Sequence, residues 1–239
     1  MIERIYQEPK PMIVSHRHRF IFLKTAKTAG SSIEAALRPH CGPDDIMTKA
    51  GPPVTFNGRK APAHNEKRGL TKLGIYVPGG LWRHVPQIAG FYPHMPGRQV
   101  RAMIGREVWD SYFKFSVERN PWDRQVSLFY YRHRRRDPKL EFESYLTSWY
   151  SWLHSNRIDN WGVYTTGGEI AVDRVLRFEN LREDFAEVCS MLGIDASLPH
   201  VNRGPARDRT DYRDYYTPRS RDIVARWYRN EIEAFGYVF

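Results

Sequence analysis

Nine residues near the start of the chain have the composition of a phosphate-binding loop. Residues 24–32 read KTAKTAGSS, between a predicted strand and a predicted helix. Gly30 permits close backbone approach to a ligand, and Ser31 and Ser32 add hydroxyl donors. Lys27 supplies a point charge for a phosphate or bridging oxygen. The Gly-x-x-x-x-Gly-Lys-[Ser/Thr] motif of nucleotide hydrolases is absent. The loop therefore predicts an anion site, with a plain strand-to-helix connection as the alternative.

A second junction offers a guanidinium and a hydroxyl for another anion. Residues 119–127 read RNPWDRQVS, and Pro121 suits the first turn of a helix. Arg119 would end the strand and Ser127 would lie two helical turns on. Both side chains could then share one phosphate, the arginine through a bidentate contact. The alternative is a capped helix with a surface arginine. Together, the two junctions suit a nucleotide that carries phosphates at both ends of its ribose.

Both junctions need strands that end where helices begin, and the sequence predicts such elements. Ser31-x-x-Glu34 has the form of a capping box, which predicts a helix start. Apolar and aromatic runs predict strands, and apolar residues at helical spacing predict helices. The alternation indicates an α/β fold, a single domain over residues 1–239 with a central parallel sheet flanked by helices. The expected strands are 18–24, 112–118 and 172–178, and the expected helices include 31–39, 97–105, 121–136, 140–155, 180–193 and one that begins at 217.

One long segment shows no such pattern. Residues 42–93 are rich in glycine, proline and scattered charge, without clear periodicity. They predict an irregular insert, and long inserts in compact domains often serve as lids or binding loops. We expect this insert to bind a ligand or to cover the site.

The chain is strongly basic, which favours an anionic partner. Lysine plus arginine number 37 against 27 aspartate plus glutamate, a net charge of +10. Hydrophobic residues make up 41%, as in ordinary globular proteins, so disorder is not expected as the main state. Cys41 and Cys189 have no metal-ligand spacing and fit a reducing compartment. No run approaches ~18 apolar residues, and residues 1–20 lack the apolar core of a signal peptide. We therefore expect a cytoplasmic protein without a membrane span.

The two motifs together resemble a known pair. Residues 27–32 and 119–127 look like the two donor-binding motifs of sulfotransferases that use 3′-phosphoadenosine 5′-phosphosulfate (PAPS). The likeness is closer to the carbohydrate branch, which includes heparan sulfate 2-O-sulfotransferase and many bacterial members. It covers residues 18–40 and 94–239 and leaves out the insert. It implies the sulfotransferase fold, similar in plan to P-loop nucleotide kinases. Four further segments resemble bacterial members: 172–181, 198–202, 215–217 and 235–239.

The resemblance implies roles for individual residues. Arg119 and Ser127 would bind the 3′-phosphate of PAPS, and Arg207, with Arg203 and Arg209, would cover the same side. Lys27 would also neutralise the oxygen that leaves sulfur, whereas Lys24 has no counterpart in the motif. The residues implied for the 5′-phosphosulfate end are Lys27, Thr28, Ala29, Gly30, Ser31 and Ser32.

Sulfuryl transfer to an alcohol also needs a base for the hydroxyl proton. A histidine with an ordinary pKa near ~6.5 suits this at neutral pH. His94 lies upstream of the strand that ends at Arg119, and members of the resembled family carry a catalytic histidine in about that place. A capping or surface histidine is the alternative interpretation. His84, His64 and Glu118 remain candidates for the base.

The sequence therefore predicts sulfuryl transfer from PAPS to a hydroxyl, with a carbohydrate as the expected acceptor. No metal and no nucleic-acid partner are expected, and the oligomeric state and the hydroxyl that is sulfated stay open. Two rivals remain. A P-loop phosphotransferase would need a Walker-type lysine and hydroxyl pair and carboxylates for Mg²⁺. A non-catalytic module that binds acidic glycan or nucleic acid would explain the charge but not two phosphate motifs.

Overall fold

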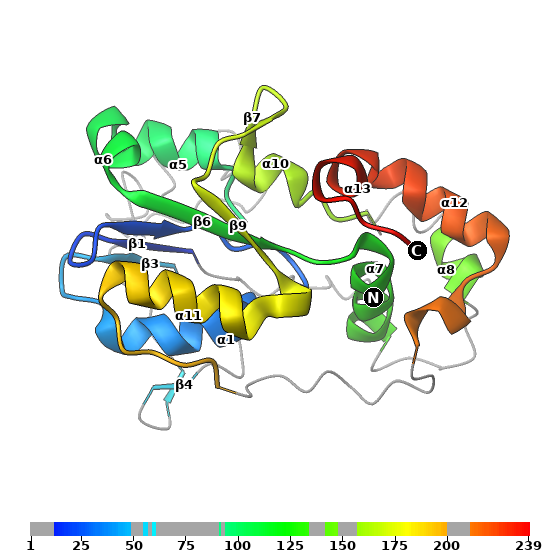
Figure 1. Ribbon diagram of the computed structural model, residues 1–239, viewed down its shortest axis with the longest axis horizontal. Coiled ribbons are helices and arrows are strands. Elements are labelled where there is room, and N and C mark those ends of the chain that lie inside the picture. Colours follow the sequence, from blue (N-terminus) through cyan, green and yellow to red (C-terminus); the bar gives the residue numbers. More distant parts are fainter. Residues whose placement is uncertain are drawn as a thin grey trace, which may run out of the picture.

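The computed structural model of the protein describes residues 12–48, 55–56, 59–60, 91, 94–133, 142–147, 157–199 and 211–239. A central sheet, in the order β3-β1-β2-β6-β9, runs through the molecule (Figure 1). Its strands are β1 (Ile13–Ser15), β2 (Phe20–Phe22), β3 (Ile46–Met47), β6 (Phe113–Glu118) and β9 (Arg174–Arg177). β2, β6 and β9 are parallel, which confirms the expected sheet at its centre. β1 pairs antiparallel with both β2 and β3. Neither was predicted, because two or three residues show no readable period.

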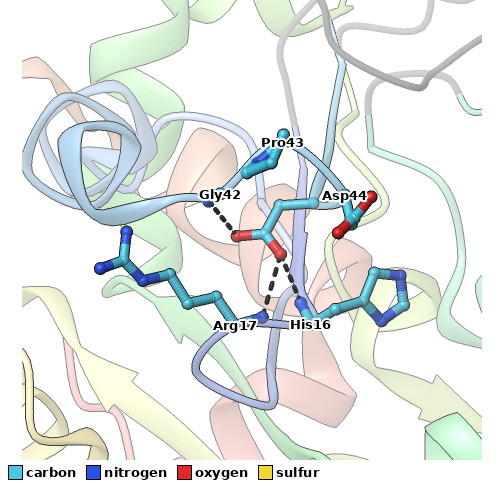
Figure 2. A pocket seen from close by; sticks show the side chains of 6 residues that line it. His16, Arg17, Gly42, Pro43 and Asp44 are labelled. Atoms are coloured by element: carbon cyan, nitrogen blue, oxygen red, sulfur yellow. Dashed lines mark hydrogen bonds between the residues drawn. The ribbon is translucent and has the colours of Figure 1, made fainter.

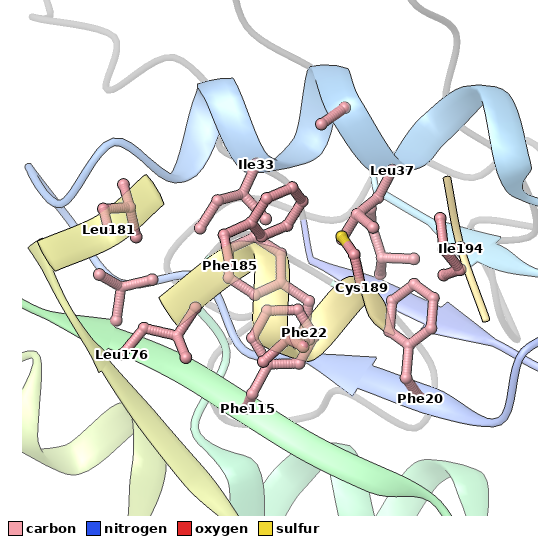
Figure 3. Close-up of a cluster of buried hydrophobic side chains, with 14 residues drawn as sticks. Phe20, Phe22, Ile33, Leu37, Phe115, Leu176, Leu181, Phe185, Cys189 and Ile194 are labelled. Carbon is pink, nitrogen blue, oxygen red and sulfur yellow. The ribbon is translucent and has the colours of Figure 1, made fainter. Parts of the chain in front are cut away.

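The central strands are apolar because helices cover both faces of the sheet. Successive side chains of a strand point to opposite faces, so Phe20 and Phe22 join one buried cluster and Ile21 joins another. The first cluster lies beneath helices α1 (Gly30–Leu37) and α11 (Leu181–Leu192). Figure 3 shows Ile33 of α1 and Phe185 of α11 meeting the strand side chains in one layer.

The opposite face is covered by three short helices. Val100, Trp109 and Val163 come from these helices and pack in the second cluster with Ile21 and Leu23. In Figure 1 they lie across the sheet from α1 and α11. The helices are α5 (Gly97–Ile104), α6 (Arg106–Ser111) and α10 (Trp161–Tyr164), and a hairpin of β7 (Thr165–Thr166) and β8 (Glu169–Ile170) follows α10.

A third cluster of mostly aromatic side chains joins the C-terminal helices to the helix that follows β6. Trp122 and Phe129 from that helix pack with Tyr145 and Tyr228. The last long helix starts at the predicted place, where Thr217 forms a capping box with its N3 residue. The helices are α7 (Pro121–His133), α8 (Phe142–Thr147), α12 (Pro218–Trp227) and α13 (Arg229–Phe235). Short 3₁₀ helices span Arg38–His40, Phe178–Asn180 and Tyr212–Tyr215, and β4 (Thr55–Phe56) pairs with β5 (Arg59–Lys60).

The beginning of the expected irregular insert belongs to the sheet, which corrects the prediction for residues 42–48. The Asp45 carboxylate accepts backbone N–H groups of His16 at 2.6 Å, Arg17 at 3.1 Å and Gly42 at 2.8 Å (Figure 2). This carboxylate fastens β3 to the turn between β1 and β2. The pocket that these residues line lies at the end of β2 opposite to the loop of residues 24–32. Most of the rest of 42–93 lies outside the described residues.

Candidate active site

The loop between β2 and α1 ends in a left-handed turn. Lys27 has φ 64° and Ala29 has φ 61°. Ala29 is the N-cap of α1, and no side chain caps this helix. The N–H of Ser32 donates to the Ala29 carbonyl at 2.8 Å, whereas the N–H groups of Gly30 and Ser31 meet no acceptor within the described part of the chain. An uncapped helix start with unsatisfied N–H groups attracts anions through these donors and the helix dipole.

The predicted capping box at Ser31 is wrong. Because Ala29 takes the N-cap position, the helix begins at Gly30 and Glu34 no longer stands at the capping distance. The Glu34 carboxylate instead forms buried ion pairs with Lys24 at 3.1 Å and with Arg38 at 2.5 Å. The electrostatic role of Glu34 is therefore to balance two buried cations behind the loop.

Lys24, the extra lysine that the motif does not require, is buried behind the loop and paired with Glu34. Its side chain is 3% exposed, and burial lowers its pKa, an effect that the Glu34 carboxylate opposes. The stem of Lys24 passes close to Gly30, where an added Cβ would lie 2.6 Å from the Lys24 Cγ. Gly30 therefore accommodates the buried lysine, and not only a ligand as the sequence suggested.

Two threonines hold the loop from within. Thr25 Oγ1 donates to the Val117 carbonyl of β6 at 2.5 Å and lies 2.8 Å from Thr28 Oγ1. Thr28 Oγ1 also lies 3.3 Å from the Thr25 carbonyl oxygen, and its side chain is 1% exposed. The hydroxyl of Thr28 thus faces the protein.

Arg119 directly follows β6 and lies beside this loop. Its Nε and Nη2 donate to Asp123 Oδ2 at 2.8 and 2.5 Å, and its Nη1 donates to the Lys27 carbonyl at 3.2 Å. The guanidinium lies 4.0 Å from the centre of the Phe178 ring. These contacts fix the plane of the arginine fork before any ligand binds. The structure therefore brings together the two motifs that the sequence placed 92 residues apart.

Helix α7 turns one face toward the loop. Asp123, Ser127 and Tyr131 recur at intervals of four residues, which places them on one side of a helix. Asp123 holds Arg119, and the Lys27 Nζ lies 4.3 Å from the centre of the Tyr131 ring. Ser127 stands between them, half-buried. The predicted pair of Arg119 and Ser127 therefore shares a face with the lysine of the other motif.

His94 lies at the end of β2, next to the loop. Its Nδ1 is 2.8 Å from the Lys24 carbonyl oxygen. A carbonyl only accepts, so Nδ1 carries the proton and Nε2 is the basic nitrogen of the neutral ring. The residue adopts φ 54°, just before the start of α5. The structure thus places His94 beside the loop, as a base at this site requires.

Glu118 is not placed to act as a base. Its side chain is fully buried, its Oε1 pairs with Arg124, and its Oε2 accepts the Tyr164 hydroxyl at 2.9 Å. Burial raises the pKa of Tyr164, so this hydroxyl stays a donor. Arg124 also binds Glu231 of α13 at 3.1 Å.

Five further residues that the sequence proposed for the site lie outside the described residues. They are His64, His84, Arg203, Arg207 and Arg209.

Three residues at the site were missed by sequence reasoning. Asp123 lies inside the second motif, and its spacing of four from Arg119 was a usable signal. Tyr131 repeats that spacing from Ser127. Asn160 gives no local signal: its side chain bonds to both the N–H and the carbonyl of Ala26, 134 residues earlier.

The described residues contain neither a membrane-spanning helix nor a cluster of metal-ligating side chains. None of their helices has the length and apolar character needed to cross a bilayer. Among the same residues, no three histidine, cysteine or carboxylate side chains gather in a way that could hold a metal ion.

Comparison with known proteins identifies the family. The chain matches the model of the sulfotransferase family over residues 10–238. It is 32% identical over 108 residues to an uncharacterized protein of Archaeoglobus fulgidus, which covers 44% of this chain and 87% of that protein. It is also similar to the crystal structure of a sulfotransferase from Alicyclobacillus acidocaldarius, with a TM-score of 0.43, 18% identity and coverage of 92% of this chain and 96% of that one. Because the family model spans nearly the whole chain, the protein belongs to the sulfotransferase family.

Proposed function

We propose that the protein transfers a sulfuryl group from PAPS to a hydroxyl of a carbohydrate. Membership of the sulfotransferase family supports the class of reaction. The observation that carries the choice of donor is the hydrogen bond from Arg119 to the Lys27 carbonyl at 3.2 Å. It joins two anion-binding motifs into one continuous site, as a nucleotide with two separated phosphate groups requires.

The described residues fit the two ends of this donor. The uncapped start of α1 offers the N–H groups of Gly30 and Ser31 to the 5′-phosphosulfate, with the Lys27 ammonium nearby. Arg119 and Ser127 would take the 3′-phosphate from the face of α7. An ATP-dependent phosphotransferase fits less well, because the loop lacks the Walker lysine and hydroxyl pair.

The reaction assigns one task to each group. The acceptor oxygen attacks sulfur and forms the new S–O bond, while the bond between sulfur and the bridging phosphate oxygen breaks. The acceptor proton passes to Nε2 of His94, whose Nδ1 is held by the Lys24 carbonyl. Lys27 and the N-terminus of α1 neutralise the charge that develops on the leaving phosphate. Positioning and fixed charge would supply most of the rate.

The acceptor is proposed from sequence. The pair of motifs resembles the carbohydrate branch of the family, and the net charge of +10 suits an acidic glycan. A transfer assay with labelled PAPS tests this against sulfated and unsulfated glycans, simple phenols and steroid alcohols. Label in glycans alone would support the proposal, and label in phenols or steroids alone would contradict the acceptor class.

The donor is tested by binding. Isothermal titration and thermal unfolding should show that 3′-phosphoadenosine 5′-phosphate (PAP) binds and stabilises the protein, whereas ATP with Mg²⁺ does not. 5′-AMP, which lacks the 3′-phosphate, is the matched control and should bind at least tenfold more weakly, since a charge-assisted contact contributes roughly 1.5–3 kcal/mol. Preference for ATP with Mg²⁺ would favour a phosphotransferase. Binding of glycan without PAP would favour a non-catalytic module.

A further inference from the structure

Asn160 makes a pair of hydrogen bonds that no other side chain near the loop repeats among the described residues. Its Oδ1 accepts the N–H of Ala26 at 2.8 Å, and its Nδ2 donates to the carbonyl of Ala26 at 3.1 Å. The side chain is 1% exposed. An N–H only donates and a carbonyl only accepts, so the orientation of the amide is fixed by its partners.

The two bonds act on consecutive peptide planes. The N–H of Ala26 belongs to the peptide that joins Thr25 to Ala26, and its carbonyl belongs to the peptide that joins Ala26 to Lys27. Asn160 therefore sets the direction in which the chain enters Lys27, whose φ of 64° is unusual for a residue other than glycine. On the far side, the Lys27 carbonyl accepts Arg119 Nη1. The backbone of Lys27 is thus held from both sides.

Asn160 is itself held firmly. It stands at the N-cap of α10, and its carbonyl accepts the N–H of Val163 at 3.0 Å. Two residues earlier, the N–H of Ile158 donates to the Tyr228 hydroxyl at 3.0 Å. Four residues later, the Tyr164 hydroxyl donates to Glu118, whose Oε1 also accepts the N–H of Arg119 at 2.9 Å. The short segment from Ile158 to Tyr164 therefore braces both halves of the site.

We infer that Asn160 is a positioning residue for the phosphate-binding loop: it holds the peptides around Ala26 so that Lys27 and the start of α1 face the donor. The inference rests on the proposed function for its consequence, weaker donor binding. Its structural part, the restraint of the loop, stands on the two hydrogen bonds alone.

Hydrogen exchange tests the restraint without any nucleotide. Asn160→Ala removes both bonds and should speed exchange of the Ala26 amide, which loses its acceptor, by roughly thirtyfold, since the two buried bonds contribute about 1 kcal/mol each. Thr165→Val is the matched control: it removes a partly buried side-chain bond to the Trp161 carbonyl, close to Asn160, without touching the loop. Equal exchange of the loop in the wild type and in Asn160→Ala would overturn the inference, whether or not PAP binds.

Asn160→Asp adds a readout that loss of stability would not produce. One carboxylate oxygen still accepts the N–H of Ala26, and the other faces its carbonyl, so the ionised form repels and the protonated form donates. The loss of PAP affinity relative to wild type should be roughly tenfold near pH 8 and should shrink as the pH falls toward about 5.5. For Asn160→Ala the relative loss should stay constant across that range. A constant ratio for Asn160→Asp, or wild-type affinity in both variants, would overturn the role in donor binding. Failure of the wild type to bind PAP would instead count against the proposed function.

Discussion

The Nη1 of Arg119 donates a hydrogen bond to the carbonyl oxygen of Lys27, so that the two anion motifs of this sulfotransferase are in direct contact. The same guanidinium is clamped by Asp123 and lies over Phe178. A substitution in one motif should therefore also alter the geometry of the other. The contact fixes the spacing between the two motifs, to which we assign the two phosphate groups of the donor.

Substitution of Arg119 should weaken donor binding more than loss of one charge explains. Arg119→Lys keeps the charge but loses the planar fork that contacts Lys27 and Asp123. We expect the Kd of PAP to rise by about tenfold in Arg119→Lys and by about a hundredfold in Arg119→Ala, measured by titration calorimetry. Arg174→Ala removes a cation whose partners, Glu187 and Asp184, lie on α11, and it should leave PAP binding unchanged. Equal losses in Arg119→Lys and Arg174→Ala would contradict a specific role.

Removal of the Tyr131 ring should slow turnover through Lys27. The Lys27 ammonium lies over this ring at 4.3 Å, and a cation–π contact contributes about 0.5–1 kcal/mol. Tyr131→Leu should lower kcat by roughly two- to fivefold, whereas Tyr131→Phe keeps the ring face and should stay nearer the wild type. Lys27→Ala, with the charge gone, should lose nearly all turnover while folding normally. Equal kcat in Tyr131→Leu and Tyr131→Phe would show that the ring does not position the lysine.

Substitution of His94 separates its hydrogen bond from its basicity. Asn tolerates the positive φ of this position, and its amide can donate to the Lys24 carbonyl as Nδ1 does. His94→Asn should therefore keep stability and PAP affinity but lose turnover by roughly 10²–10⁴-fold, the usual contribution of a general base. His94→Ala should lose turnover and some stability as well. Near-normal turnover in His94→Asn would assign the base to another residue.

Glu34→Gln should make stability depend on pH through Lys24. Burial already lowers the pKa of Lys24 below 10.5, and loss of the Glu34 charge removes what opposes that shift. The unfolded chain then binds the lysine proton more tightly than the folded chain. The free energy of unfolding should therefore rise with pH between the lowered folded pKa and 10.5, more steeply than in wild type.

Urea denaturation at neutral and alkaline pH measures this effect. Near neutral pH the variant should be less stable than wild type by about 3 kcal/mol, because a buried cation has lost its partner. The deficit should narrow as the pH approaches about 9.5. Glu187→Gln removes an equal charge from an exposed pair and should show no such narrowing. A deficit for Glu34→Gln that stays constant with pH would mean that Lys24 keeps an ordinary pKa.

Sequence patterns predicted the elements of the site where local signals decide the structure. The aromatic and β-branched run before Arg119 forms β6, Pro121 begins α7, and Thr217 caps α12. Gly193 takes the left-handed conformation at the end of α11, as a stop glycine should. In each case, the deciding contacts lie within a few residues of one another.

The failures lie where distant residues compete with a local signal. Ser31 and Glu34 match the sequence pattern of a capping box, but the Glu34 carboxylate pairs with Lys24 and Arg38 once β2 and α1 pack together. Asn160 has no pattern at all, since its partner is a backbone group 134 residues earlier. The sequence favoured Lys27 over Lys24 for the donor, and that assignment stays a prediction: the structure buries Lys24, whereas the Lys27 ammonium lies over Tyr131 on α7.

The hydrogen bonds between Asn160 and Ala26 also determine when, during its synthesis, the chain can bind a ligand at the loop. A ribosome that adds about 5–20 residues per second makes the loop on the order of 10 s before it reaches Asn160. During that interval the nascent chain carries both lysines, but the residues that shape the loop, Val117, Arg119 and Asn160, are not all present. Nucleotide recognition should therefore appear late, as a sign that most of the chain has been translated and folded.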